Sequence, residues 1–227
     1  MSRRFAANAL LAYWDGVGEE TAPRTVVHGE EAIGRALAAE HRSREPVLTL
    51  REGSDVFVEG RLCTAGDLTG SYVASIQLDG EGAIVRCLCL HGPPVEPPDE
   101  PPRAPPPGAA RTTLDRYFAR LIASDFAGAA ACFSSDCLYS HPPYRPGSPR
   151  VEFRGRDRLR EGFEERGPRP ARPAIVRCVQ RGADCFIEGV VDGIPDGGSF
   201  VSSATLDGDG LVHRYVAFYT QSRIARA

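Results

Sequence analysis

Residues 138–147, with the sequence LYSHPPYRPG, hold a histidine in a rigid setting between two tyrosines. His141 is followed by two prolines, which fix their own φ angles and restrict the residue before them to extended conformations. Imidazole ionises near neutral pH, so it can accept and return a proton, a role worth about 10²–10⁴-fold in rate. The stretch therefore favours an acid–base role for His141, with Tyr139 on the same face of an extended segment. A packed histidine in a tight turn is the alternative interpretation.

Composition excludes several other kinds of chemistry. All 27 basic residues are arginine, so no lysine can form a Schiff base or hold a nucleotide phosphate. The seven cysteines include no C-x-x-C pair and lie mostly in apolar runs, which favours reduced, buried thiols over a metal site or disulfides. Cys87 and Cys89 share one face of a strand, but we assign no metal site to them. We expect no metal and no cofactor.

The charge and hydropathy patterns also narrow the choice of partners. The net charge of −3 gives no strong field toward nucleic acid or an anionic membrane. The N-terminal apolar run is interrupted by Asn8 and Asp15, and no apolar stretch reaches the length of about 18 residues that a membrane span needs. We therefore expect a cytoplasmic protein that binds neither nucleic acid nor a membrane, and the arginine-only, Ala-, Gly- and Pro-rich composition is typical of a GC-rich bacterial genome.

The chain contains an internal duplication on either side of a proline-rich segment. Residues 55–60 (DVFVEG) match residues 184–189 (DCFIEG), and residues 71–82 match residues 199–210 in seven of twelve positions. Residues 93–107 hold nine of the 19 prolines and predict an extended linker of up to about 45 Å. We predict a first domain at 1–92, a linker at 93–110 and a second domain at 111–227.

The second copy predicts helices followed by an antiparallel meander, an α+β arrangement. Residues 112–123 have helical spacing, with Thr112 and Asp115 placed as a capping box. A second helix starts at Ser124 or Asp125 and extends to Phe133. An extended stretch, a charged helix and strands follow at 138–153, 156–166, 174–181, 184–192, 199–206 and 211–220.

The first copy is predicted to be truncated. Its segment FAANALLAYWDG, from Phe5, can be aligned with FAGAAACFSSDC, from Phe126. The first copy would then begin at the second helix and have no counterpart of residues 112–124. In this alignment Glu20 takes the place of His141 and Ala74 that of Ser202, and we interpret the copy as degenerate.

The second copy resembles the nuclear transport factor 2-like superfamily, and its SnoaL-like branch in particular, over about residues 112–221. The resemblance lies in RYF, in DCLYSHPPY, in FRGRDRLR and in DGDGLVHRY. It implies a cone-shaped fold in which a curved sheet wraps around helices and leaves an apolar pocket, so that two such domains would lie in this chain, the first without its N-terminal helix. The branch includes polyketide cyclases, ketosteroid isomerases and dehydratases, so the fold alone does not define the reaction.

The resemblance also implies roles for individual residues. Tyr117 falls where ketosteroid isomerases have the tyrosine that hydrogen-bonds the developing oxyanion, His141 falls at their general-base carboxylate, and Ser202 at their protonated aspartate. Because both carboxylates are replaced, acid–base chemistry is implied rather than steroid isomerisation itself. The candidate substrate-binding residues are Tyr139, Tyr144, His213 and Tyr215.

These observations predict a cofactor-independent acid–base enzyme that acts next to a carbonyl of a small apolar, polyketide- or terpenoid-like metabolite. The reaction would be an isomerisation, cyclisation or dehydration of secondary metabolism. The alternative is a non-catalytic module that binds a small molecule or mediates dimerisation.

We also expect the two copies to pair within the chain as a pseudo-dimer, with a homodimer as a further possibility. A linker of this length would raise the effective concentration of one copy for the other to about millimolar. Residues 110–227 expressed alone should then self-associate or lose stability, as measured by sedimentation and thermal unfolding. A monomeric fragment as stable as the whole chain would contradict the pairing.

Overall fold

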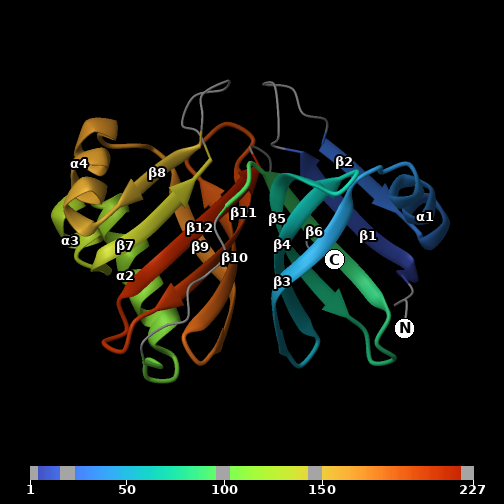
Figure 1. Cartoon of the computed structure of the whole chain (residues 1–227), viewed down its shortest axis with the longest axis horizontal. Coiled ribbons are helices and arrows are strands. Elements are labelled where there is room, and N and C mark those ends of the chain that lie inside the picture. Colours follow the sequence, from blue (N-terminus) through green and yellow to red (C-terminus); the bar gives the residue numbers. More distant parts are fainter. Residues whose placement is uncertain (1–4, 16–23, 96–102, 143–149, 221–227) are drawn as a thin grey trace. The chain divides into compact units, whose positions relative to one another are not determined.

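The structure, a computed structural model, describes residues 5–15, 24–95, 103–142 and 150–220. The chain divides into a first unit that runs to Glu96 and a second unit that begins at Pro97. This division falls inside the predicted proline-rich linker. Each unit has a six-stranded sheet and packs at least one helix against it (Figure 1).

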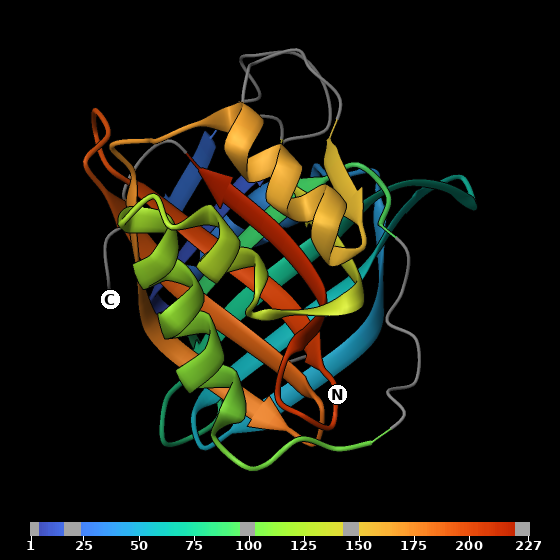
Figure 2. The same ribbon diagram turned by 90° about the vertical axis from the view of Figure 1, so that its left-hand side faces the viewer.

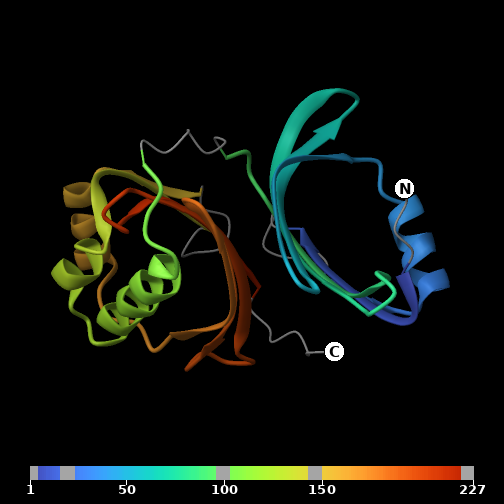
Figure 3. The same cartoon turned by 90° about the horizontal axis from the view of Figure 1, so that it is seen from below.

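The second unit combines three helices with a curved sheet of order β8-β7-β12-β11-β10-β9. Neighbouring strands are antiparallel except β7 and β12, which are parallel. Figure 2 shows α2, α3 and α4 on the same side of this sheet, and Figure 3 shows α2 within its curve. The elements are α2 (Ala109–Ile122), α3 (Phe126–Ala130), β7 (Phe133–His141), β8 (Val151–Arg154), α4 (Arg156–Arg166), β9 (Arg172–Arg181), β10 (Asp184–Asp192), β11 (Gly198–Leu206) and β12 (Val212–Thr220).

This arrangement confirms the predicted α+β fold class, but two local expectations about the helices are wrong. Helix α2 begins at Ala109 after Gly108, so Thr112 and Asp115 lie within the first turns and form no capping box. Asp115 instead pairs with the side chain of Arg111, one turn earlier. Asp125 does cap α3, since its side chain accepts a hydrogen bond from the backbone of Gly128 at 2.8 Å. Helix α3 is short, however, and Phe133 already belongs to strand β7.

Apolar side chains of α2 attach the helices to the sheet. Leu114, Tyr117 and Phe118 lie one helical turn or less apart and are buried in the core of the second unit. The ring of Phe118 contacts Phe200 of β11 at 5.6 Å between centroids, and Tyr117 contacts Phe133 of β7 at 5.0 Å. The same periodicity that predicts the helix therefore also directs Tyr117 toward the concave face of the sheet.

The first unit repeats the sheet with fewer helices. Its strand order is β2-β1-β6-β5-β4-β3, which is the order of the second sheet, and it again pairs its first and last strands in parallel. Helix α1 follows β2 as α4 follows β8. The elements are β1 (Phe5–Asp15), β2 (Arg24–His28), α1 (Glu30–Ala38), β3 (Ser43–Glu52), β4 (Asp55–Thr64), β5 (Asp67–Leu78) and β6 (Ile84–Gly92).

Strand pairing corrects the expected start of the first copy. Phe5 pairs with Ile84 in the first sheet as Phe133 pairs with Val212 in the second, so residues 5–15 correspond to strand β7 and not to helix α3. Among the residues that the structure describes, the first unit has a counterpart of neither α2 nor α3.

Gly189 of β10 lets a pocket-lining ring lie against the backbone. A Cβ atom at this position would be 2.3 Å from the ring of Phe200 and 2.4 Å from the carbonyl oxygen of Ala174, far inside van der Waals contact. We therefore expect Gly189→Ala to lower the free energy of unfolding by about 1–3 kcal/mol, as overpacking of a core does. Urea unfolding measures this change.

Gly34→Ala is the matched control, because Gly34 lies on α1 with no heavy atom within 4 Å of an added Cβ. That substitution should raise the free energy of unfolding by up to about 1 kcal/mol, since alanine is the better helix former. Equal effects of the two substitutions would contradict the close approach at Gly189.

Candidate active site

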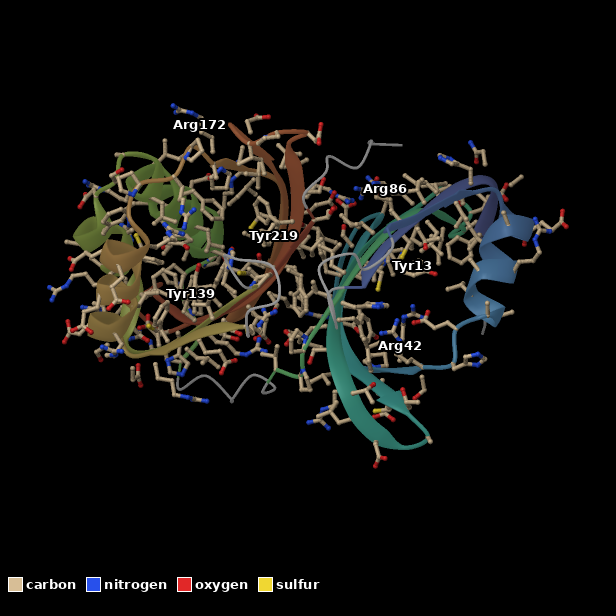
Figure 4. All side chains as sticks on the ribbon, turned by 90° about the horizontal axis from the view of Figure 1, so that it is seen from above. Tyr13, Arg42, Arg86, Tyr139, Arg172 and Tyr219 are labelled. Atoms are coloured by element: carbon tan, nitrogen blue, oxygen red, sulfur yellow. The ribbon has the colours of Figure 1, made fainter. Side chains whose placement is uncertain are left out.

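A cavity of about 500 Å³ opens in the second unit between α2 and the concave face of the sheet. Its inner wall is mainly aromatic, with side chains from α2, β7, β11 and β12. Figure 4 shows Tyr139 of β7 and Tyr219 of β12 on the side of the sheet that carries the helices. Tyr117 and His141, which the sequence singles out, both line the cavity. A largely apolar pocket with a few convergent polar groups is the usual form of a small-molecule site.

His141 ends strand β7, where the chain leaves the sheet for the two prolines. Its Nδ1 lies 2.7 Å from the carbonyl oxygen of Pro142, and a carbonyl can only accept a hydrogen bond. Nδ1 therefore carries the proton, and Nε2 keeps its lone pair. The ring stacks on Tyr139 at 6.0 Å between centroids and contacts Tyr219 at 5.6 Å. The proline fixes the tautomer as well as the direction of the imidazole.

The surroundings of His141 keep its imidazole neutral. Burial, with a smaller contribution from the nearby guanidiniums of Arg150 and Arg166, lowers the pKa of His141 to about 3, and the bond to Pro142 opposes the change. At neutral pH the side chain is thus a base whose Nε2 carries no proton, and it cannot serve there as an acid until it has accepted one.

A group of phenol hydroxyls lies beside this base. The hydroxyl of Tyr117 donates to that of Tyr139 at 3.3 Å, and both side chains are almost fully buried. Tyr215 lines the pocket as well, and its ring stacks on Tyr139 at 5.5 Å between centroids. Phenol hydroxyls in a site with little water are effective donors to a developing negative charge.

Ser202 occupies a different place from the one that the resemblance implies. It is fully buried on β11 and does not line the cavity. Its hydroxyl instead lies 3.0 Å from the hydroxyl of Tyr215. Ser202 therefore positions Tyr215 rather than contacting a ligand itself.

The remaining sequence candidates divide between the pocket and its surroundings. His213 shares a strand face with Tyr215 but lies outside the cavity, where its Nδ1 is 3.2 Å from Ser134 and 3.3 Å from Asp136. Tyr144 lies outside the described residues. The pocket also has members that the sequence analysis missed, of which Tyr219 could have been found because it is two alternations beyond Tyr215 on the same strand face. The others of consequence are Phe200, Arg166, Arg169 and Asp196.

Strand register assigns a different residue of the first unit to the position of His141. Leu11 pairs with Cys87 as Tyr139 pairs with Tyr215, so Tyr13, two residues on, corresponds to His141. Glu20, which the sequence alignment places there, lies outside the described residues. A tyrosine of the first unit thus stands where the second unit has a histidine, and the reverse holds at a second position. There His91 corresponds to Tyr219, as the pairing of β5 with β6 and of β11 with β12 shows.

The equivalent region of the first unit lacks two of the tyrosine hydroxyls that line the pocket of the second unit. Leu11 and Cys87 replace two of its tyrosines. The His91 ring stacks on Tyr13 at 6.1 Å between centroids, accepts a hydrogen bond from Arg42 at 3.3 Å and lies 3.4 Å from the sulfur of Cys89. Burial raises the pKa of the Cys89 thiol to about 11, so it is not a nucleophile at neutral pH.

The described residues contain neither a cluster suited to a metal ion nor a helix suited to a membrane. Within residues 5–15, 24–95, 103–142 and 150–220, no group of three or more His, Cys, Asp or Glu side chains is placed to hold a metal ion. No helix in that part of the chain has the length and apolar character to span a membrane.

The pKa of His141 has a consequence for stability. Because the folded pKa of about 3 lies below the unfolded value of about 6.5, the unfolded chain binds a proton between these pH values and the folded chain does not. Stability contributed by the neutral imidazole is present above the unfolded pKa and is lost as the pH falls toward the folded pKa. Relative to His141→Gln, the protein should therefore lose about 2 kcal/mol of unfolding free energy between pH 7 and pH 5.

Urea unfolding of both proteins at the two pH values measures this difference. An identical difference between them at both values would show that the pKa of His141 is not lowered in the folded protein.

Part of the second unit is similar to known proteins. Residues 114–223 match the family model for a SnoaL-like domain. No curated protein matches the chain. Solved structures with a similar fold include an NTF-2 like protein of unknown function from Burkholderia xenovorans LB400, with 17% identity over 52% of this chain and 88% of that chain and a TM-score of 0.42. Another, from Catenulispora acidiphila DSM 44928, has a ketosteroid isomerase-like fold, with 12% identity over 48% of this chain and 85% of that chain and a TM-score of 0.39.

Proposed function

We propose that the second unit, which is a SnoaL-like domain of the nuclear transport factor 2-like superfamily, catalyses proton transfer next to a carbonyl group of a small, largely apolar compound. The observation that carries the proposal is the state of His141. It lines the pocket as a neutral imidazole, and the bond from Nδ1 to Pro142 leaves Nε2 as its basic nitrogen.

The chemistry divides between the base and the phenols. Nε2 of His141 takes the proton from the carbon next to the carbonyl, and the electron pair of the broken C–H bond moves toward the carbonyl oxygen to form an enolate. With a substrate bound, the hydroxyl of Tyr117 turns from Tyr139 to donate to that oxygen as its charge grows, and the hydroxyl of Tyr139 then donates to that of Tyr117. The imidazolium then returns the proton to another carbon, which isomerises the substrate, or to a departing hydroxyl, which dehydrates it.

The pocket wall supports the substrate class. Phe118, Leu121 and Val191 add aliphatic and aromatic surface to the tyrosines, and the cavity of about 500 Å³ has room for a fused-ring skeleton. Polyketide- or terpenoid-like ketones have this shape and carry acidic protons next to a carbonyl. The chain's own residues supply both the base and the oxyanion donors, so the proposed reaction requires no cofactor.

One observation favours a second function, in which the pocket binds a ligand without turnover. A base with a pKa of about 3 is weak at neutral pH, and general-base catalysis is most efficient when the pKa lies near the working pH. The Asp base of ketosteroid isomerases, with a pKa of about 4.6, shows that a weak base suffices where the enolate is well stabilised. The strength of the phenol donors therefore decides between the two functions.

Deuterium exchange of the α-protons of 2-tetralone, a bicyclic ketone, tests the proposal without knowledge of the natural substrate. In D₂O at pD 7 the protein should accelerate exchange, followed by proton NMR, well beyond an equal concentration of free imidazole. Binding of 2-tetralone without acceleration would reject catalysis and favour the binding function.

A further inference from the structure

The mouth of the pocket has a different character from its interior. The buried lining residues are aromatic apart from Ala217, whereas the exposed ones lie in the segment before β9 and in the loop between β10 and β11. These two segments abut, since a Cβ atom on Gly193 would lie 2.0 Å from the carbonyl oxygen of Pro170. The charged side chains of the lining are Arg166, Arg169 and Asp196, two cations and one anion.

Arg166 extends the positive charge of the mouth into the pocket. It lies in the last turn of α4, and its guanidinium is placed over the ring of Phe163 at 5.3 Å from the centroid. Its charge is also one of those that lower the pKa of His141. A ligand in the pocket is therefore within the field of this guanidinium, and Arg169 adds a second cation that is exposed at the mouth.

We propose that the substrate carries a carboxylate, which Arg166 and Arg169 bind at the mouth while the apolar skeleton lies among the tyrosines. This inference rests on the proposed function and specifies its substrate as an apolar keto acid. Guanidinium groups present planar pairs of N–H donors that match the two oxygens of a carboxylate. Asp196, on the same rim, disfavours a doubly charged phosphate. Anchoring the acid at the rim would direct the carbonyl end of the molecule toward Tyr117 and His141.

Calorimetric titration with 2-naphthoate and with 2-naphthamide tests the anion site, because the two probes share a skeleton and differ in charge. At low ionic strength the naphthoate should bind about tenfold more tightly than the amide, as expected for hydrogen bonds to a charged group. Added salt should reduce that preference, since the mouth is exposed to solvent. Arg166→Gln should remove most of the preference, and Arg169→Gln should reduce it by about twofold to fivefold.

Two further variants test the location. Arg172→Gln is the matched control, because Arg172 is an exposed arginine at the start of β9 that does not line the pocket (Figure 4). It should leave the preference unchanged. Asp196→Asn should strengthen naphthoate binding.

The possible outcomes distinguish failure of the carboxylate site from failure of the proposed proton-transfer function on which it rests. Equal affinities for the acid and the amide would overturn the anion site and leave the proton-transfer pocket intact. An Arg172→Gln effect as large as that of Arg169→Gln would also overturn it, because the preference would then follow net charge. Failure of both probes to bind would overturn the site and count against the pocket as well.

Discussion

Replacing His141 with glutamine should slow the α-proton exchange of 2-tetralone by about 10²–10⁴-fold, the usual contribution of a positioned general base. Glutamine keeps a polar side chain of similar reach, but its amide has no basic nitrogen at neutral pH. The affinity for 2-tetralone should change little, because the aromatic wall remains. Exchange rates from proton NMR and affinities from calorimetry separate the two effects.

Two controls define what the His141 result means. His213→Gln makes the same change in the same unit at a histidine outside the pocket, and Tyr13→Phe changes the corresponding position of the first unit. Neither should slow exchange. Equal losses from His141→Gln and His213→Gln would point to a general loss of structure and would count against a base at His141.

Removing the hydroxyl of Tyr117 is the second large effect that we expect. Tyr117→Phe should lower the exchange rate by about 10²–10³-fold, the cost of one lost oxyanion donor. The loss should appear in kcat more than in KM, because the donor acts on charge that develops in the transition state. The ring contacts of Tyr117 with Phe133 and Phe163 do not involve its hydroxyl, so the variant should lose only the hydrogen bond to Tyr139, about 0.5–1.5 kcal/mol of unfolding free energy.

Ser202→Ala provides the contrast. Since Ser202 bonds Tyr215 and does not line the pocket, its removal should cost much less than removal of the Tyr117 hydroxyl. A larger loss from Ser202→Ala than from Tyr117→Phe would mean that the enolate oxygen is held by Tyr215 and not by Tyr117.

Local patterns predict much of the fold of the second unit correctly. The apolar spacing of residues 112–123 predicts α2, and the strands at 174–181, 184–192, 199–206 and 211–220 agree with β9 to β12 apart from one or two residues at some ends. Alternation and turn residues act over a few positions, so one sequence contains them. The repeat of DVFVEG and DCFIEG likewise predicts two related sheets, and both pair their strands in the same order.

Features that depend on distant parts of the chain are less accessible to prediction. Phe5 resembles Phe126 in its local sequence, but its pairing with Ile84 assigns it to the position of Phe133. The parallel pairing of first and last strands joins residues about 80 positions apart, and no local pattern encodes it. The same limit explains why Glu20, rather than Tyr13, is assigned to the His141 position from sequence.

In the candidate site, too, local sequence predicts some residues, and others depend on distant parts of the chain. Tyr117, Tyr139 and His141 are identified by their motifs, and the fold brings them to one cavity. Ser202 cannot be assigned correctly, because only the register of β11 and β12 shows that its hydroxyl meets Tyr215. Arg166 and Arg169 lie in a charged stretch in which Arg158 pairs with Glu161 and Arg160 with Glu164, and nothing in the sequence distinguishes the pocket arginines from these.

The central claim is that His141 is a neutral imidazole whose basic nitrogen is Nε2. A nitrogen-15 NMR titration of the protein, with the His141 signals assigned by their absence in His141→Gln, measures this state directly. We expect a proton on Nδ1 at pH 7, none on Nε2, and no further protonation of the ring until the pH falls to about 3. A proton on Nε2 at pH 7, or titration near the ordinary value of about 6.5, would contradict the account.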